Sequence, residues 1–202
     1  MSIRIKLAVG AFTLSLASVA LAQTPMKPSR IRGEIVSLGG DTLAVHRRSG
    51  DTVKIAVKAD TPVTALRNIK LEDIKPGSFV GTAAMTGADG KLTATEVLVF
   101  PEAARGMGEG HYAWDMGSNS SMTNANVDEV VQSTNGRDLK LSYKGGSNAI
   151  TVPVNVPIVT FAPATHDDLK PGKQVFVVAT PAGSDYTAQR IVVEKDGVKP
   201  PM

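Results

Sequence analysis

The residues Asp73-Ile-Lys-Pro-Gly77 return as Asp168-Leu-Lys-Pro-Gly172, 95 positions further along the chain. Pro followed by Gly is typical of a type II turn, in which Gly supplies the positive φ that the turn requires. The segments around the two turns also match: Leu139 follows Leu43 by 96 positions, and the last strand-like segments match at 94. Offsets that stay within one residue over this length indicate an internal duplication, which sets the organisation of the chain.

Each copy has the pattern of short β-strands rather than helices. The clearest strand is Thr52–Lys58, where Val and Ile alternate with Lys and Ala at the period of a half-buried strand. One helical turn is expected near Leu71–Ile74. The strands predicted in the first copy are Ile31–Leu38, Thr42–Arg47, Thr52–Lys58, Phe79–Met85 and Leu92–Phe100, and those that open the second copy are Asn126–Val131, Asp138–Tyr143 and Ala149–Val154.

Five short strands, with a helical turn between the third and the fourth, follow the order of an oligonucleotide/oligosaccharide-binding (OB) barrel. We therefore expect an all-β protein of two tandem five-stranded OB-like β-barrels, joined by an irregular connector that contains Gly, Met and Trp. An open sandwich with the same strand order is the alternative. The predicted segments are a signal peptide (1–22), a lead-in (23–29), the first barrel repeat (30–100), the connector (101–122), the second barrel repeat (123–196) and a tail (197–202).

The first residues predict export to the periplasm. Arg4 and Lys6 precede an apolar run that ends in Ala20-Leu21-Ala22, so a signal peptide cleaved after Ala22 is expected. The run is short and rich in Ala, Ser and Thr, which disfavours a membrane anchor. No later segment is long and apolar enough to span a bilayer, and the chain has no Cys for disulfides or thiolate metal sites.

The charge balance does not point to a nucleic-acid partner. The chain has 22 Lys and Arg against 19 Asp and Glu, a net charge of +3. Cleavage of the signal would remove Arg4 and Lys6, which brings the net charge of the exported protein close to +1. No polyanion partner follows from so small an excess. The expected partner is an envelope protein or a small anionic ligand.

The connector carries the least ordinary side chains of the chain. Met107, His111 and Met116 are soft thioether and imidazole donors that suit Cu(I), and acidic neighbours of His111 would suit a harder divalent ion. Their spacing is irregular, which favours a structural role over a metal site. Tyr112 and Trp114 are expected to lie between the two barrels, with Trp114 substantially buried.

Two further groups of side chains are candidates for binding. His46, Arg47, Arg48 and Lys54 lie on or beside the second and third strands, the face that commonly receives the ligand in OB barrels. A basic strip there suits an anionic glycan or lipid headgroup, although a solvated polar face is the favoured explanation. His166 stands beside two Asp residues, where one of them is expected to cap a helical turn.

The repeated turn, the export signal and the connector phrase FPEAARGMGEGHYAWD together resemble exported bacterial proteins of the domain-of-unknown-function family 5666. The resemblance covers nearly the whole exported chain. It implies an OB-like β-barrel fold and a cell-envelope location, and it brings no catalytic or binding residues. Some similar proteins carry a label that suggests a metal-transporter permease, but this chain has no spanning segment with which to act as one.

No enzyme signature is present. The sequence lacks a G-x-S-x-G elbow, an H-E-x-x-H helix, a G-x-x-x-x-G-K-[ST] loop and any Cys nucleophile. No cofactor is expected. The sequence therefore predicts a non-enzymatic periplasmic protein that acts by binding or by supporting an envelope assembly, and the alternative is metal handling through the connector.

Overall fold

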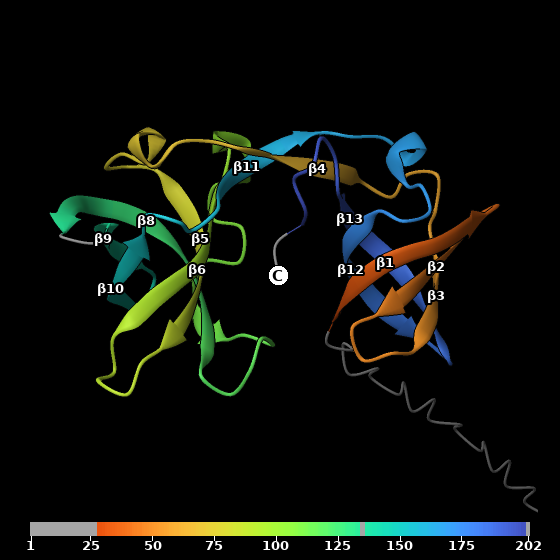
Figure 1. Cartoon of the computed structure of the whole chain (residues 1–202), viewed down its shortest axis with the longest axis horizontal. Helices are drawn as coiled ribbons and strands as arrows, with labels where there is room; N and C mark the ends of the chain where they lie inside the picture. Colours follow the sequence, from red (N-terminus) through yellow and green to blue (C-terminus); the bar gives the residue numbers. More distant parts are fainter. Residues whose placement is uncertain (1–27, 134–135, 201–202) are drawn as a thin grey trace, which may run out of the picture.

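The structure is a computed structural model that describes residues 28–133 and 136–200 (Figure 1). The predicted signal peptide and almost all of the lead-in lie outside the described residues. Within them the chain forms strands and three short 3-10 helices, none of which is long and apolar enough to cross a membrane. The strands are β1 (Ser29–Gly39), β2 (Thr42–Arg47), β3 (Thr52–Ala56), β4 (Val63–Asn68), β5 (Phe79–Thr86), β6 (Leu92–Val99), β7 (Gly110–Ala113), β8 (Ser120–Ser133), β9 (Gly136–Tyr143), β10 (Gly146–Pro153), β11 (Ile158–Pro163), β12 (Gln174–Ala182) and β13 (Asp185–Val193), and the 3-10 helices are η1 (Leu71–Asp73), η2 (Glu102–Ala104) and η3 (His166–Asp168).

Five strands close into what we call the first ring. β1 pairs with β2 and β12, β2 with β3, and β12 with β13, all antiparallel. A parallel pairing of β13 with β3, where Tyr186 stands opposite Ile55, closes the ring. In Figure 1 this ring is the lobe that combines orange strands with dark blue ones.

The second ring repeats this pattern with other strands. β8 pairs with β9 and β5, β9 with β10, and β5 with β6, again antiparallel. A parallel pairing of β10 with β6, where Ile150 stands opposite Leu92, closes it. Both rings therefore use four antiparallel pairings and one parallel pairing.

The all-β barrel character agrees with the prediction, but the expected tandem arrangement is not what the strand pairings give. The first ring takes β1, β2 and β3 from the first half of the chain and β12 and β13 from the second half. The second ring takes β5 and β6 from the first half and β8, β9 and β10 from the second half. Because the two halves have similar strand patterns, an open three-stranded unit can be closed by the last two strands of either half.

β4 and β11 carry the chain from one ring to the other, as the upper part of Figure 1 shows. They pair antiparallel with each other, and Leu66 stands opposite Phe161, 95 positions later. This is the offset of the repeated turns, so the register is symmetric about this pair. β4 also pairs with β13, and β11 with β6, both parallel. The two crossovers thus join both rings into one sheet.

The repeated Lys-Pro-Gly turns each contact the first strand of the opposite half. The main-chain N–H of Gly172 donates to the carbonyl of Ile35 at 2.8 Å, and that of Gly77 donates to the carbonyl of Val127 at 2.7 Å. Both Gly residues have a positive φ, +84° for Gly172 and +87° for Gly77. A residue with a side chain would be strained in this backbone conformation. Each turn therefore fixes its own half against the other.

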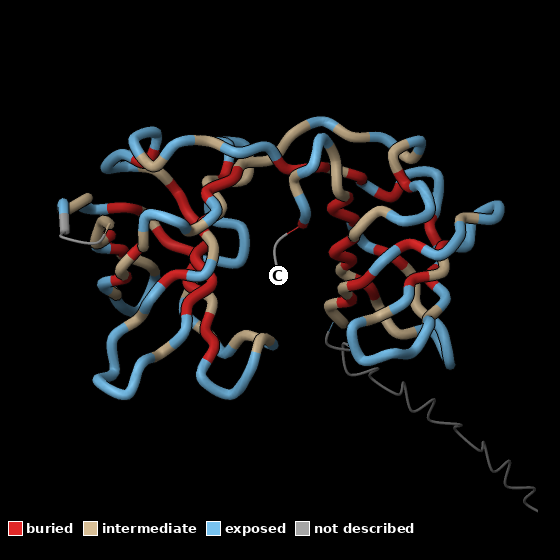
Figure 2. Tube along the Cα trace, in the orientation of Figure 1, coloured by how far each residue is buried: buried red, intermediate tan, exposed pale blue. Residues whose placement is uncertain are grey.

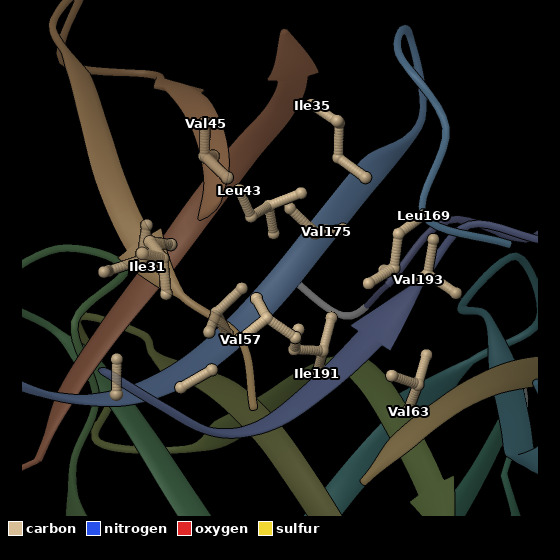
Figure 3. Close-up of a cluster of buried hydrophobic side chains, with 14 residues drawn as sticks. Ile31, Ile35, Leu43, Val45, Val57, Val63, Leu169, Val175, Ile191 and Val193 are labelled. Atoms are coloured by element: carbon tan, nitrogen blue, oxygen red, sulfur yellow. The ribbon is translucent and has the colours of Figure 1, made fainter. Parts of the chain in front are cut away.

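Both halves of the chain supply each hydrophobic core, and Figure 2 shows buried segments in both rings. In the first ring Ile31 and Leu43 pack with Val175, Ile191 and Val193 from the far end of the sequence (Figure 3). The second ring has an equivalent cluster around Leu139 and Leu141. Neither half can complete a core alone in this arrangement.

The connector lies against the second ring and also reaches the first. β7 pairs antiparallel with β8 outside the closed ring, with Tyr112 opposite Met122. The last residues of the connector, from Ser120 onward, already belong to β8, and they pair with β5. The connector thus begins as an irregular segment and ends as a strand of the barrel.

A cavity between the two rings as the candidate functional site

A cavity of about 560 Å³ lies between the two rings. Its walls come from the outer faces of β12 and β13 in the first ring and of β5, β6 and β8 in the second, while the crossovers and the connector complete it. This volume lies within the range of roughly 300–1,000 Å³ that is typical of small-molecule sites. The apolar side chains of the wall include Leu98, Phe100, Trp114, Phe161, Phe176 and Val192.

At two equivalent positions the second ring has a small residue where the first ring has a larger one. Phe176 and Val178 on β12 stand 95 positions after Gly81 and Ala83 on β5. A Cβ at Gly81 would lie 2.7 Å from Oδ1 of Asn124 and 3.0 Å from the ring of Phe100. The absence of a side chain at Gly81 is therefore required for the packing of this wall.

Two arginines line the wall on the side of the first ring. The guanidinium carbon of Arg30 lies 4.2 Å from the ring centroid of Trp114, and Nη1 of Arg190 donates to Sδ of Met107 at 3.0 Å. Burial lowers the pKa of Arg190 and the charge of Arg30 lowers it further, against an opposing contribution from Tyr112. A guanidinium nevertheless stays charged. Across residues 28–133 and 136–200, neither arginine forms an ion pair with a carboxylate.

Asn124 on β8 is the most deeply buried amide in the cavity wall, with 7% of its surface exposed. Its Nδ2 donates to the carbonyl of Met107 at 2.9 Å and lies 3.3 Å from the hydroxyl of Tyr112. Among the described residues its Oδ1 has no hydrogen-bond partner, and this atom is buried within the wall. Burial also raises the pKa of Tyr112, so its hydroxyl stays protonated.

Trp114 joins the connector to the first strand of the first ring. Its indole lies beneath Arg30 and, at 5.3 Å, beneath Arg32, whose Nη1 forms an ion pair of 2.8 Å with Asp115. Arg32 also lies 4.7 Å above the ring of Phe176. Trp114 is partly exposed because one side borders the cavity. The structure thus places it between the rings, with most of its surface buried.

The three candidate metal ligands of the connector lie in three different surroundings. Met107 borders the main cavity, and Met116 borders a second hollow of about 260 Å³. His111 points to the other side of β7, where its Nδ1 lies 2.8 Å from Oγ1 of Thr123 and 2.9 Å from Nδ2 of Asn148. The described part of the chain holds no group of three or more His, Asp or Glu side chains that could bind a metal ion.

The predicted basic strip is not continuous. His46 and Lys54 are exposed on the outer face of the first ring, whereas Arg47 lies on the opposite face of β2 and forms an ion pair with Asp51. Hydrogen bonds from Arg47 lower the pKa of Asp51 to about 2. Arg48 lies in the exposed turn beyond. Neighbouring residues in a strand point to opposite faces, which divides the strip.

His166 has a structural role at the start of the second repeated turn. Its Nε2 lies 2.8 Å from the carbonyl of Thr61, to which it donates, and the carboxylate of Asp168 caps η3 by accepting the main-chain N–H of Thr165 at 2.9 Å. The other two histidines hydrogen-bond to Thr and Asn side chains. Within residues 28–133 and 136–200, these hydrogen-bond partners include no Ser hydroxyl or Asp carboxylate.

The residues that sequence reasoning missed are Arg30, Arg190 and Asn124. A position-by-position comparison of the two repeats contains a signal for Arg190, which stands 94 positions after Glu96. Both line the cavity, on opposite rings. A change of charge between equivalent outward-facing positions indicates that the outer faces of the two rings have different roles. Only the fold shows that these two positions face one cavity.

Comparison with protein-family profiles, with curated proteins and with solved structures gave no significant match. The resemblance to family 5666 therefore stays a prediction from the sequence. The features that bear on function are the cavity and its two arginines.

Proposed function

We propose that this protein is an exported, non-enzymatic binding protein whose inter-ring cavity holds a small molecule with a largely apolar surface. The observation that carries the proposal is the cavity of about 560 Å³, which combines aromatic and aliphatic walls with a few polar groups. Sites for small molecules have this composition. Export and the periplasmic location rest on the predicted signal peptide.

We also propose that the chain arose by internal duplication and that each ring is an OB-like barrel assembled from both halves. In the first ring β12 returns to lie beside β1, next to the run β1-β2-β3. This is the spatial order of a Greek key, on which the OB fold is built. The symmetric register of Leu66 with Phe161 supports the duplication.

Support of an envelope assembly is a further part of this proposal, in which the bound molecule or an outer face of a ring would contact the partner. Metal handling through the connector is the alternative, although Met107 and Met116 border different hollows and His111 faces Thr123 and Asn148.

Filling the cavity tests the proposal. Ala104 lines the cavity, whereas Ala103 beside it in η2 is exposed and does not. We expect Ala104→Phe to abolish binding of amphiphiles such as decan-1-ol and decanoate, and Ala103→Phe to leave it unchanged. Fluorescence of Trp114, the only tryptophan and part of the cavity wall, reports binding directly.

Native mass spectrometry of the purified protein is the second test, because a molecule retained from the cell would be seen as added mass. If no amphiphile alters Trp114 fluorescence, or if Ala104→Phe binds as well as the wild-type protein, the cavity is not a binding site.

A further inference from the structure

We propose that the inter-ring cavity selects an amphipathic anion, whose carboxylate or phosphate lies between Arg30 and Arg190 and whose apolar body contacts Phe161 and Phe176. This inference rests on the proposed binding function and specifies its ligand. It requires that the two arginines bind the ligand rather than stabilise the fold.

The cavity is polarised although the two rings are alike. The registers of β1 with β12 and of β8 with β5 make Arg30 the counterpart of Met122, because they stand opposite Val178 and Ala83, which are 95 positions apart. Arg190 on β13 is likewise the counterpart of Glu96 on β6. One wall therefore carries two cations where the other carries a thioether and a carboxylate. An anionic group is stabilised only at the first-ring wall.

The protein itself satisfies these cations poorly. Arg190 donates to the sulfur of Met107, a weak acceptor, and Arg30 lies over the indole of Trp114. Arg30 is half-buried and Arg190 is exposed. An anion that accepts hydrogen bonds from the two guanidinium groups would relieve their mutual repulsion. An apolar environment strengthens such bonds.

The test compares decanoate and decyl phosphate with the uncharged decan-1-ol, by calorimetry and by Trp114 fluorescence. We expect at least one of the two anions to bind about tenfold or more tightly than the alcohol, because hydrogen bonds to charged groups are the strong ones. Arg190→Gln and Arg30→Gln should each remove most of this preference while affinity for decan-1-ol stays the same. Lys54→Gln, an equal charge change on the outer face of the first ring, is the control.

Measurements on the unmodified protein keep the inference testable if an arginine variant fails to fold. Affinity for the bound anion should fall as salt concentration rises, and affinity for decan-1-ol should not fall. Equal affinity for alcohol and anions, with no salt dependence, would overturn the choice of an anion and leave the binding function intact. Failure of all three probes to bind would instead count against the binding function itself.

Discussion

Gly33 in β1 shows how closely the strands of the first ring approach. A Cβ at this position would lie 2.1 Å from the carbonyl oxygen of His46 and 2.9 Å from Cγ1 of Val45. The first of these atoms belongs to the backbone, so it cannot rotate away. Gly39, in the same strand, has no atom within 4 Å of the equivalent point and no positive φ.

We predict that Gly33→Ala destabilises the protein by about 1–3 kcal/mol, the usual cost of overpacking. Gly39→Ala should change stability by less than about 0.5 kcal/mol, as surface substitutions do. Urea denaturation of the two variants measures the difference. Equal stability of both variants would show that β1 and β2 do not approach this closely.

The ion pair between Arg32 and Asp115 holds the connector to β1. The side chain of Arg32 is 11% exposed and that of Asp115 38% exposed, so solvent screens the pair only in part. Loss of the carboxylate would leave a nearly buried guanidinium without its counter-charge. The exposed pair of Lys91 with Asp89 has no such consequence, with side chains 79% and 59% exposed.

We predict that Asp115→Asn lowers the free energy of unfolding by about 1–2 kcal/mol, between the values for surface and buried ion pairs. It should also shift the fluorescence emission of Trp114, because Arg32 would no longer be held beside the indole by Asp115. Asp89→Asn serves as the control and should cost less than about 0.5 kcal/mol. Denaturation followed by Trp114 fluorescence gives both quantities. An unchanged emission maximum and midpoint in Asp115→Asn would contradict this role.

At the scale of elements, strands with alternating side chains were predictable and the crossovers were not. Thr42–Arg47 was predicted with the bounds that β2 has, and η1 lies where a helical turn was expected. β4 and β11 are missing from the prediction, because Val63–Asn68 does not alternate and its partners lie far away in sequence. Such a segment becomes a strand only through tertiary pairing.

The short helix η3, before the second repeated turn, gives the protein a pH-dependent contribution to stability. In η3 the N–H of Thr165 lowers the pKa of Asp168, and the ammonium of Lys195, 3.1 Å away, lowers it further. The folded pKa is therefore below the unfolded value of about 3.9. The stabilisation is present above the unfolded pKa and is lost as the pH falls through the folded pKa.

We predict that Asp168→Asn lowers the urea midpoint at pH 7 and that the gap from the wild-type protein closes as the pH falls below the unfolded pKa of about 3.9. Asp167→Asn, at the exposed neighbouring position, should show a smaller effect at pH 7. Urea titrations at several pH values provide the comparison. A gap that widens on acidification would reverse the sign and refute the assignment.

At the scale of the molecule, the exchange of strands distinguishes this fold from two separate barrels. Glu34 stands opposite Gln174, and Nε2 of Gln174 donates to Oε2 of Glu34 at 3.2 Å. In the tandem arrangement Gln174 would instead face Asn126, which here stands opposite Phe79. The two arrangements therefore predict different neighbours for one residue.

We predict that the variant Glu34→Cys with Gln174→Cys forms a disulfide on mild oxidation, since directly opposed residues have the Cα separation that the bond requires. Asn126→Cys with Gln174→Cys should remain reduced. The chain has no Cys of its own, so intact mass after alkylation reports each bond without background. A disulfide in the second pair and none in the first would show that the chain forms the tandem barrels instead.

The sequence by itself determined the all-β character, the alternating strands and the repeated turns, because side-chain period and Pro-Gly chemistry act over a few residues. It also singled out Tyr112 and Trp114 in the connector as candidate residues between the two rings. Only the tertiary structure decided which half closes which ring, because the strands of both halves offer equivalent edges and cores. It likewise decided that Arg30 and Arg190, 160 positions apart, line one cavity, since no local pattern records which outer faces the crossovers bring together.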